Sequence, residues 1–130
     1  MGLESVKKAA KSGNWKIVDR EIPSLAQDSR TVIWAWNEGV SSKIENFRDL
    51  GASILEKAPI NNEAWPEIRD KLVPLLHDTA PYIRFRAACA LAAHEPGEYR
   101  TQVIITLQDF MNDSEKDVVK IAKTYLKQLS

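Results

Sequence analysis

The sequence predicts an all-α protein, a solenoid of about four helical hairpins, and three observations support this fold class. Apolar residues recur at spacings of three and four along most of the chain, and no long stretch alternates apolar with polar residues. Only 5 glycines and 6 prolines interrupt its 130 residues. The same pattern of apolar positions returns after 35 or 36 residues, a period typical of stacked helical hairpins.

We interpret the chain as one domain, residues 1–130, because this length suits a single hydrophobic core. The eight predicted helices are 3–12, 14–27, 29–40, 43–57, 62–77, 80–94, 97–112 and 114–129. They pair into hairpins at 3–27, 29–57, 62–94 and 97–129. The β-branched run Val103–Ile105 could instead form a strand, but Val103, Leu107 and Met111 keep helical spacing, which favours a helix.

Residues that cap or interrupt helices stand near the predicted boundaries. Candidate N-caps are Asn14, Asp28 with Ser29, Ser41 with Ser42, and Asp113 with Ser114. Pro66 fits the first turn of a helix, where its missing N–H has no partner to lose. Pro23 and Pro74 fall inside predicted helices, so we expect them to kink or shorten these helices.

The internal repeat is clearest among the last three hairpins. A shift of 36 residues aligns Val32 with Ile68, Trp36 with Leu72, Val40 with Leu76, Phe47 with Ile83, Gly51 with Ala87, Ala52 with Ala88 and Leu55 with Leu91. A shift of 35 carries Ile68, Leu72, Leu76, Asp78, Ile83, Ala87 and Leu91 onto Val103, Leu107, Met111, Asp113, Val118, Ala122 and Leu126. A rival shift of 51 aligns Pro23 with Pro74 but leaves residues 41–57 unexplained, so we prefer the shorter period.

The third hairpin resembles a HEAT repeat, one of the armadillo-like helical repeats. The resemblance rests on Leu72, Val73, Pro74 and Leu76 in its first helix, then on Asp78, Pro81, Ile83, Arg84, Ala87, Ala88 and Leu91. The last hairpin is similar through Asp113, Val118, Ala122 and Leu126, but has Val119 where the family usually places arginine. The second hairpin keeps Arg48 and has Ser42 where aspartate is usual. Such a resemblance implies a fold, a right-handed superhelix of stacked hairpins, rather than an activity.

The same resemblance implies a structural ladder between hairpins, made by Asp78, Arg84 and Asp113. In HEAT-like proteins the arginine of one repeat reaches toward the turn aspartate of a neighbouring repeat. A turn aspartate can also accept amide hydrogen bonds from the start of the following helix. We therefore expect these three residues to hold hairpins together and to take no part in catalysis.

Composition argues against several classes of function. Lys+Arg and Asp+Glu each number 18, so no overall charge draws the chain to nucleic acid or to an anionic membrane. No apolar run is long enough to span a bilayer, and the start lacks the apolar core of a secretory signal. The single cysteine, Cys89, suits a reducing compartment, which favours a cytoplasmic location.

No residue cluster predicts catalysis. His77 and His94 have no cysteine or carboxylate at metal-ligand spacing. The chain also has no glycine-rich phosphate loop, and no pair of nucleophile and base can be assembled from its sequence. We therefore expect neither an enzyme nor a bound metal or cofactor.

The candidate partner-binding residues are Trp34, Arg48, Tyr82, Arg86, Lys116, Lys120, Lys123 and Lys127. The four lysines follow at intervals of 4, 3 and 4 residues, which places them on one face of the last predicted helix. Trp34 and Trp36 point about 200° apart on a helix. The repeat predicts that Trp36 faces inward, so Trp34 either packs on the neighbouring hairpin or is exposed as an anchor. By the family resemblance, Arg48, Tyr82 and Arg86 would line an inner surface formed by the second helices.

The sequence thus favours a non-catalytic scaffold that binds an unidentified protein or peptide on the surface lined by the second helices. One alternative is a nucleic-acid-binding HEAT-like module that uses Arg84, Arg86, Arg100 and the lysines, although net neutrality argues against it. Another alternative is a regulatory subunit of a larger enzyme. No pattern in the sequence predicts the oligomeric state.

Overall fold

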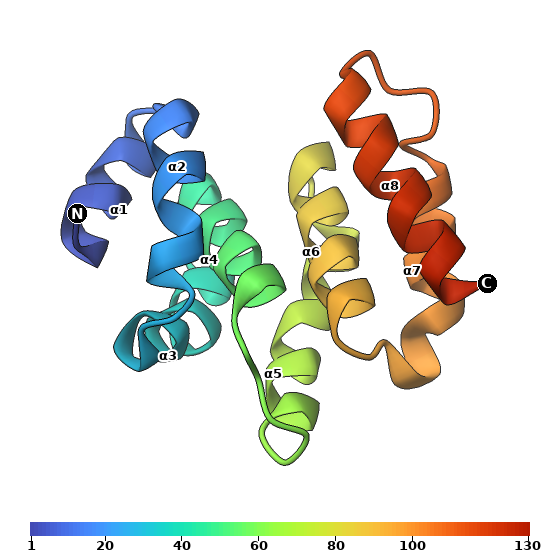
Figure 1. Cartoon of the computed structure of the whole chain (residues 1–130), viewed down its shortest axis with the longest axis horizontal. Helices are drawn as coiled ribbons and strands as arrows, with labels where there is room; N and C mark the ends of the chain where they lie inside the picture. Colours follow the sequence, from blue (N-terminus) through green and yellow to red (C-terminus); the bar gives the residue numbers. More distant parts are fainter.

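Residues 1–130 are all described by the computed structural model, which contains eight α-helices, three short 3₁₀ segments and no strand (Figure 1). The helices are α1 (Leu3–Lys11), α2 (Trp15–Leu25), α3 (Ser29–Asn37), α4 (Glu45–Lys57), α5 (Trp65–Leu72), α6 (Pro81–Ala93), α7 (Arg100–Gln108) and α8 (Lys116–Leu129). The 3₁₀ segments are Gly39–Ser41, Val73–His77 and Gly97–Tyr99. The prediction of an all-α chain with eight helices is confirmed. No helix has the combination of length and apolar character that crossing a membrane requires.

Each odd-numbered helix packs on the even-numbered helix that follows it. The pairs are joined chiefly where α4 packs on α6, and where α6 packs on α7 and α8. In Figure 1, α2, α4, α6 and α8 follow one another across the molecule from left to right. A cluster of 31 buried apolar residues, from Val6 to Ala122, draws on all eight helices. The helices therefore share one continuous core.

One turn geometry recurs before α4, α6 and α8. The side chains of Ser42, Asp78 and Asp113 each accept a hydrogen bond from the backbone N–H two residues later, in every case at 3.0 Å. The residue whose N–H donates this bond is the last extended residue before the helix. The expectation that Ser42 and Asp113 cap the first turn of a helix is corrected. Each accepts its hydrogen bond from the extended residue that precedes the helix, and α4 and α8 begin two residues later than predicted.

The other helix ends follow the local chemistry of the sequence. Asn14 and Asp28 cap α2 and α3 by accepting from the backbone N–H groups of Ile17 and Thr31, as predicted. Pro66 lies in the first turn of α5, also as predicted. Pro74 ends this α-helix, since the chain continues from Val73 as a 3₁₀ segment. Pro23 falls in the last turn of α2, which stops at Leu25.

The inward-facing residues predicted for the third hairpin are buried. Ile68 and Leu72 of α5 and Leu76 of the following 3₁₀ segment all reach the core. The matching positions of α6 are also in the core, namely Ile83, Ala87, Ala88 and Leu91. Alanines at these positions let α4 approach α6 closely while preserving helix propensity.

In the second hairpin the predicted inward residues Val40, Gly51, Ala52 and Leu55 are buried, but the prediction for Trp36 in its first helix is wrong. Helix α3 ends at Asn37, and its buried residues are Thr31, Trp34 and Ala35. Trp34 is therefore the inward tryptophan, at 9% exposure, while Trp36 is half-buried. Close packing at glycine explains the change: a Cβ on Gly39 would stand 3.0 Å from the Trp34 ring, and a Cβ on Gly51 3.0 Å from the backbone nitrogen of Val40. Larger residues at either glycine would force this segment away from α4.

Candidate functional site

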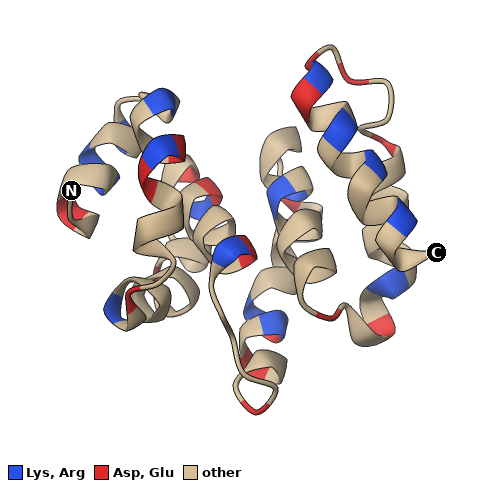
Figure 2. Ribbon diagram, viewed as in Figure 1, with Lys and Arg blue, Asp and Glu red and all other residues tan.

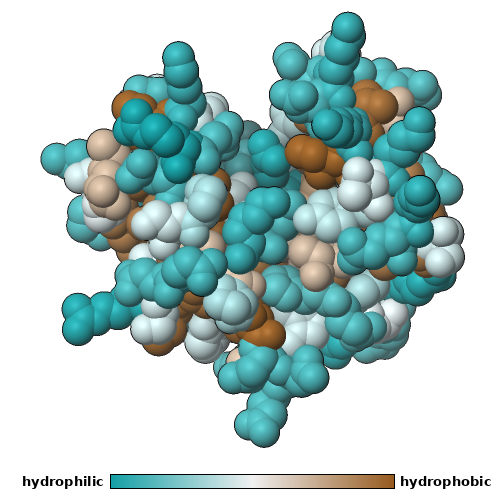
Figure 3. All heavy atoms as spheres, in the orientation of Figure 1, coloured by the Kyte–Doolittle hydropathy of each residue, from teal (hydrophilic) through white to brown (hydrophobic).

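Three hollows follow one another along α4, in the surface that α2 and α4 form with α6 and α8. We call them together the second-helix groove. The mouth pocket, about 220 Å³, includes Trp15, Glu45, Asp49 and Tyr82. The middle pocket, about 300 Å³, includes Asp19, Glu56, Lys57, Arg86 and Asp117, and the end pocket, about 440 Å³, adds Lys120 and Tyr125. Figure 3 shows this face notched between the two halves of the molecule, with mainly hydrophilic atoms around the notch.

Helix α4 presents a polar stripe to the groove. Glu45, Asp49, Ser53 and Glu56 succeed one another at intervals of 4, 4 and 3 residues, which places them on one helix face. The Asp49 and Glu56 side chains are only 16% and 7% exposed. Buried carboxylates are destabilising unless they are paired or hydrogen-bonded, so their partners decide the chemistry of the groove.

Asp49 has an incomplete set of partners. Ser53 Oγ donates to its Oδ1 at 3.2 Å, and Arg86 Nε of α6 lies 3.6 Å from the same oxygen, too far for a hydrogen bond. Arg86 Nε is itself buried without any acceptor. Burial raises the pKa of Asp49, and the nearby Arg86 guanidinium offsets only part of that increase. The groove thus holds a carboxylate whose charge is only partly compensated.

Glu56 is better satisfied. The Tyr125 hydroxyl of α8 donates to Glu56 Oε2 at 2.6 Å, and Lys57 Nζ lies 3.6 Å from this oxygen. Burial and the neighbouring Glu56 carboxylate raise the pKa of Tyr125 above its ordinary value, so the phenol stays protonated and acts as a donor. Burial likewise raises the pKa of the nearby Cys89 thiol, which disfavours the reactive thiolate. This cluster can bind polar groups, and it offers no activated nucleophile.

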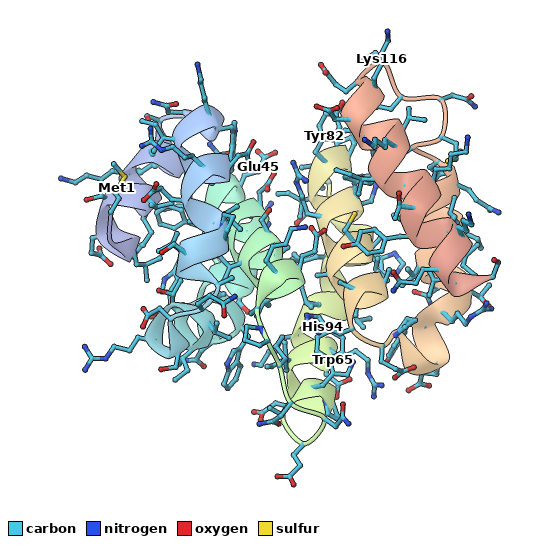
Figure 4. All side chains as sticks on the ribbon, in the orientation of Figure 1. Met1, Glu45, Trp65, Tyr82, His94 and Lys116 are labelled. Carbon is cyan, nitrogen blue, oxygen red and sulfur yellow. The ribbon has the colours of Figure 1, made fainter.

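Tyr82 and Glu45 stand at the mouth of the groove. Figure 4 shows them on opposite sides of the gap, at the N-terminal ends of α6 and α4. Tyr82 is 42% exposed, and its hydroxyl donates to Asp113 Oδ2 at 3.0 Å, which raises the pKa of the phenol. The hydrogen bond holds the ring in place while the side chain remains partly accessible.

The predicted partner-binding residues separate into three groups. Arg86 and Tyr82 line the groove, and of the four lysines only Lys120 does so. Lys116, Lys120, Lys123 and Lys127 are all exposed on α8, where Figure 2 shows the basic stripe along the helix. Of the two alternatives for Trp34, exposure as an anchor is wrong, because its ring is buried against Phe47 at a centroid distance of 5.9 Å, so Trp34 is not a partner-binding residue.

The inter-hairpin contact is made by Arg48 and not by Arg84. Arg48 donates from Nε to Asp78 Oδ2 at 2.7 Å and from Nη2 to Oδ1 at 3.2 Å, which joins the second hairpin to the third. Arg84 turns back and donates to the carbonyl oxygen of Asp78 at 2.7 Å. Asp113 accepts from Tyr82 instead. Asp78 and Asp113 thus join neighbouring hairpins as expected, Asp113 through Tyr82 and not through an arginine. The expected roles of Arg84 in the ladder and of Arg48 on the binding surface are corrected.

Sequence reasoning missed the acidic and aromatic part of the groove. The missed residues are Trp15, Asp19, Glu45, Asp49, Glu56, Asp117 and Tyr125. The regular spacing of the polar stripe on α4 was the available signal, because it places four polar side chains on one helix face. The partners across the groove come from other helices and leave no local pattern in the sequence.

Comparison with known proteins adds no relative to this description. No family model matches the chain, and neither a curated protein nor a solved structure matches it. No group of three or more His, Cys, Asp or Glu side chains is gathered so that it could hold a metal ion.

Asp49→Asn should raise the thermal midpoint Tm at pH 7. A pKa above the unfolded value means that this group stabilises the folded state when protonated at low pH, and that the contribution is lost as pH rises through the folded pKa. The neutral amide therefore removes a net unfavourable charge at pH 7, and its advantage should shrink toward pH ~4, near the ordinary aspartate pKa. Thermal melts at both pH values measure this. Asp70→Asn, a change at a carboxylate 68% exposed, is the control; a lower Tm for Asp49→Asn at pH 7 would show that the pairing with Arg86 outweighs burial.

Proposed function

We propose that this chain is a non-catalytic scaffold of HEAT-like hairpins, stacked as a right-handed superhelix, which binds a protein or peptide partner in the second-helix groove. The observation that carries the proposal is the row of three hollows along α4, lined from four different helices. An elongated polar groove of this kind fits an extended chain better than it fits a compact small molecule. Small-molecule sites are usually enclosed and mainly apolar.

The buried charges of the groove support the same proposal. Asp49 and Arg86 are held with few partners in a surface hollow, although a purely structural surface gains little from buried charge. Polar groups from a bound chain would complete their hydrogen bonds. The groove also has both charge signs, which suits the varied side chains of a polypeptide.

Site-specific photo-crosslinking tests the proposal. A benzophenone amino acid is placed at Lys57 or Asp117, both exposed in the groove, and at Glu63 or Gln102, both exposed outside it. After irradiation in a lysate of the source cells, we expect discrete crosslinked products from the groove positions and none from the two outer positions. Products from the outer positions alone, or no products at all, would contradict the proposal. A catalytic chain among the products would identify the protein as a regulatory subunit.

Nucleic-acid binding is the second candidate, and the exposed lysines of α8 are the observation that favours it. The carboxylates of the middle pocket oppose it, because Asp19, Glu56 and Asp117 would repel phosphates. A gel shift with single- and double-stranded probes at ~50 mM salt is decisive, since phosphate-driven binding is strongest at low salt. We expect no shift.

A further inference from the structure

We infer that the mouth pocket receives an arginine side chain of the partner, so that the second-helix groove recognises an arginine-bearing peptide segment. This inference rests on the proposed function and adds the chemistry of the partner. The pocket is bounded by the Trp15 and Tyr82 rings and by the Glu45 and Asp49 carboxylates. Its lining contains no lysine and no arginine.

The pairing of aromatic rings with carboxylates selects a planar cation. A guanidinium group stacks on aromatic faces, and its five donors can bind carboxylate oxygens in a fixed fork. Tyr82 is 42% exposed and is oriented by its hydrogen bond to Asp113, so its ring position does not depend on the ligand. An ammonium ion would use the same charges but would not stack as a plane.

The two nearest arginines leave the charge of the pocket only partly compensated. Arg48 does not line the pocket, and both of the hydrogen bonds that it donates to a carboxylate go to Asp78. Arg86 lines the middle pocket and reaches Asp49 from there, with 3.6 Å between Nε and Oδ1. Glu45 has no ion-pair partner within the structure. The mouth pocket thus has negative charge that an incoming cation can compensate.

The rest of the groove agrees with a basic segment. Beyond the mouth, the middle pocket carries Asp19, Glu56 and Asp117 against Arg86 and Lys57. A peptide lying along α4 would meet carboxylates in both pockets. An acidic peptide would find cations only beyond the mouth and would be repelled by Glu45 and Asp49 at the mouth pocket, so charge complementarity there favours the arginine-bearing segment.

Fluorescence anisotropy with two labelled hexapeptides tests the inference at ~50 mM salt, where charge pairing is least screened. The probes are Gly-Arg-Gly-Arg-Gly-Arg and the same peptide with citrulline, a neutral residue of nearly the same shape, at each arginine. We expect the arginine peptide to bind at least about tenfold more tightly, which corresponds to about 1.4 kcal/mol. Equal binding of the two peptides, or no binding of either, overturns the inference.

Matched variants locate the binding. Glu45→Gln and Asp49→Asn should each lower the affinity for the arginine peptide by about fivefold or more. Trp15→Leu should have a similar effect, within the range of cation–π and ion-pair contributions. Glu63→Gln and Asp70→Asn remove exposed carboxylates outside the groove and should change affinity less than about twofold, since distant charges are screened. Glu45 is exposed, so its substitution leaves the core intact. If the control variants weaken binding as much as the pocket variants, the binding is unspecific and the inference fails.

The outcome separates this inference from the proposed function. If neither peptide binds while crosslinks still form from Lys57 and Asp117, the groove binds a partner of other chemistry and only the arginine pocket is refuted. If the groove positions give no crosslinks as well, both proposals fail.

Discussion

Phe85→Ala should lower the free energy of unfolding by about 3–5 kcal/mol, the usual effect of deleting a large buried aromatic side chain. Phe85 lies in α6, is 0% exposed and packs on Phe110 with ring centroids 4.9 Å apart. The substitution leaves a cavity where the third hairpin meets the fourth, and the rigid helices around it can close only part of the space. Since a domain of this size is stable by only about 5–15 kcal/mol, the loss is a large share of the total.

Urea denaturation followed by circular dichroism measures this loss. Ile105→Ala is the matched control, because Ile105 is 54% exposed on the adjacent helix α7. Its effect should stay within about 0.5 kcal/mol, as for most surface substitutions. A loss below about 1 kcal/mol for Phe85→Ala would mean that the hairpins are not joined through this contact.

Asp78→Ala should destabilise the protein by about 3 kcal/mol, the low end of the range for removing one member of a buried ion pair. The side chain of Asp78 is only 6% exposed, accepts two hydrogen bonds from Arg48 and also holds the backbone N–H of Ala80. Removing it leaves the Arg48 guanidinium partly buried with only the carbonyl oxygens of Ser42 and Lys43 as acceptors. The joint between the second and third hairpins is therefore weakened.

A double-mutant cycle with Arg48→Met separates the interaction energy of the Arg48–Asp78 pair from the contribution of Asp78 to the turn before α6. The coupling between the two substitutions should exceed about 1 kcal/mol, as for contacting residues in one network.

The destabilisation caused by Asp78→Ala should also depend on pH. Burial alone would raise the pKa of Asp78, but the hydrogen bonds from Arg48 and Ala80 lower it below its ordinary value. A lowered pKa means that the stabilisation is present above the unfolded value near 3.9 and is lost as pH falls through the folded pKa. Additive effects that do not vary with pH would refute an energetically coupled pair.

The sequence predicted helices best where a single apolar ladder and the local turn chemistry agreed. The third hairpin is the example, since its inward residues and its turn aspartate were recognised from spacing alone. The same spacing argument failed for the first helix of the second hairpin, because aligning Trp36 with Leu72 assumed a continuous helix through Val40. The helix stops earlier, where Gly39 and Gly51 allow a close backbone approach that no side-chain pattern encodes.

The candidate site was predicted only in part for a related reason. Tyr82 and Arg86 were found because they lie at outward positions of the clearest repeat. Asp49 approaches Arg86 from another helix, and its importance comes from burial, which sequence spacing does not report. Arg48 and Arg84 occupy equivalent positions, and each donates to the carbonyl oxygen of its own turn residue, Ser42 or Asp78. Only three-dimensional packing decides that Arg48 alone reaches the next aspartate.

Hydrogen exchange gives the most direct test of the central claim, that partners bind the face lined by the second helices. The chain is compared free and in complex with the partner that the groove crosslinkers at Lys57 and Asp117 identify. We predict that the added protection of backbone amides concentrates in α2, α4, α6 and α8, with the strongest effect at the N-terminal turns of α4 and α6 around the mouth pocket. Protection centred on α3, α5 and α7, with the groove helices unchanged, would contradict the account.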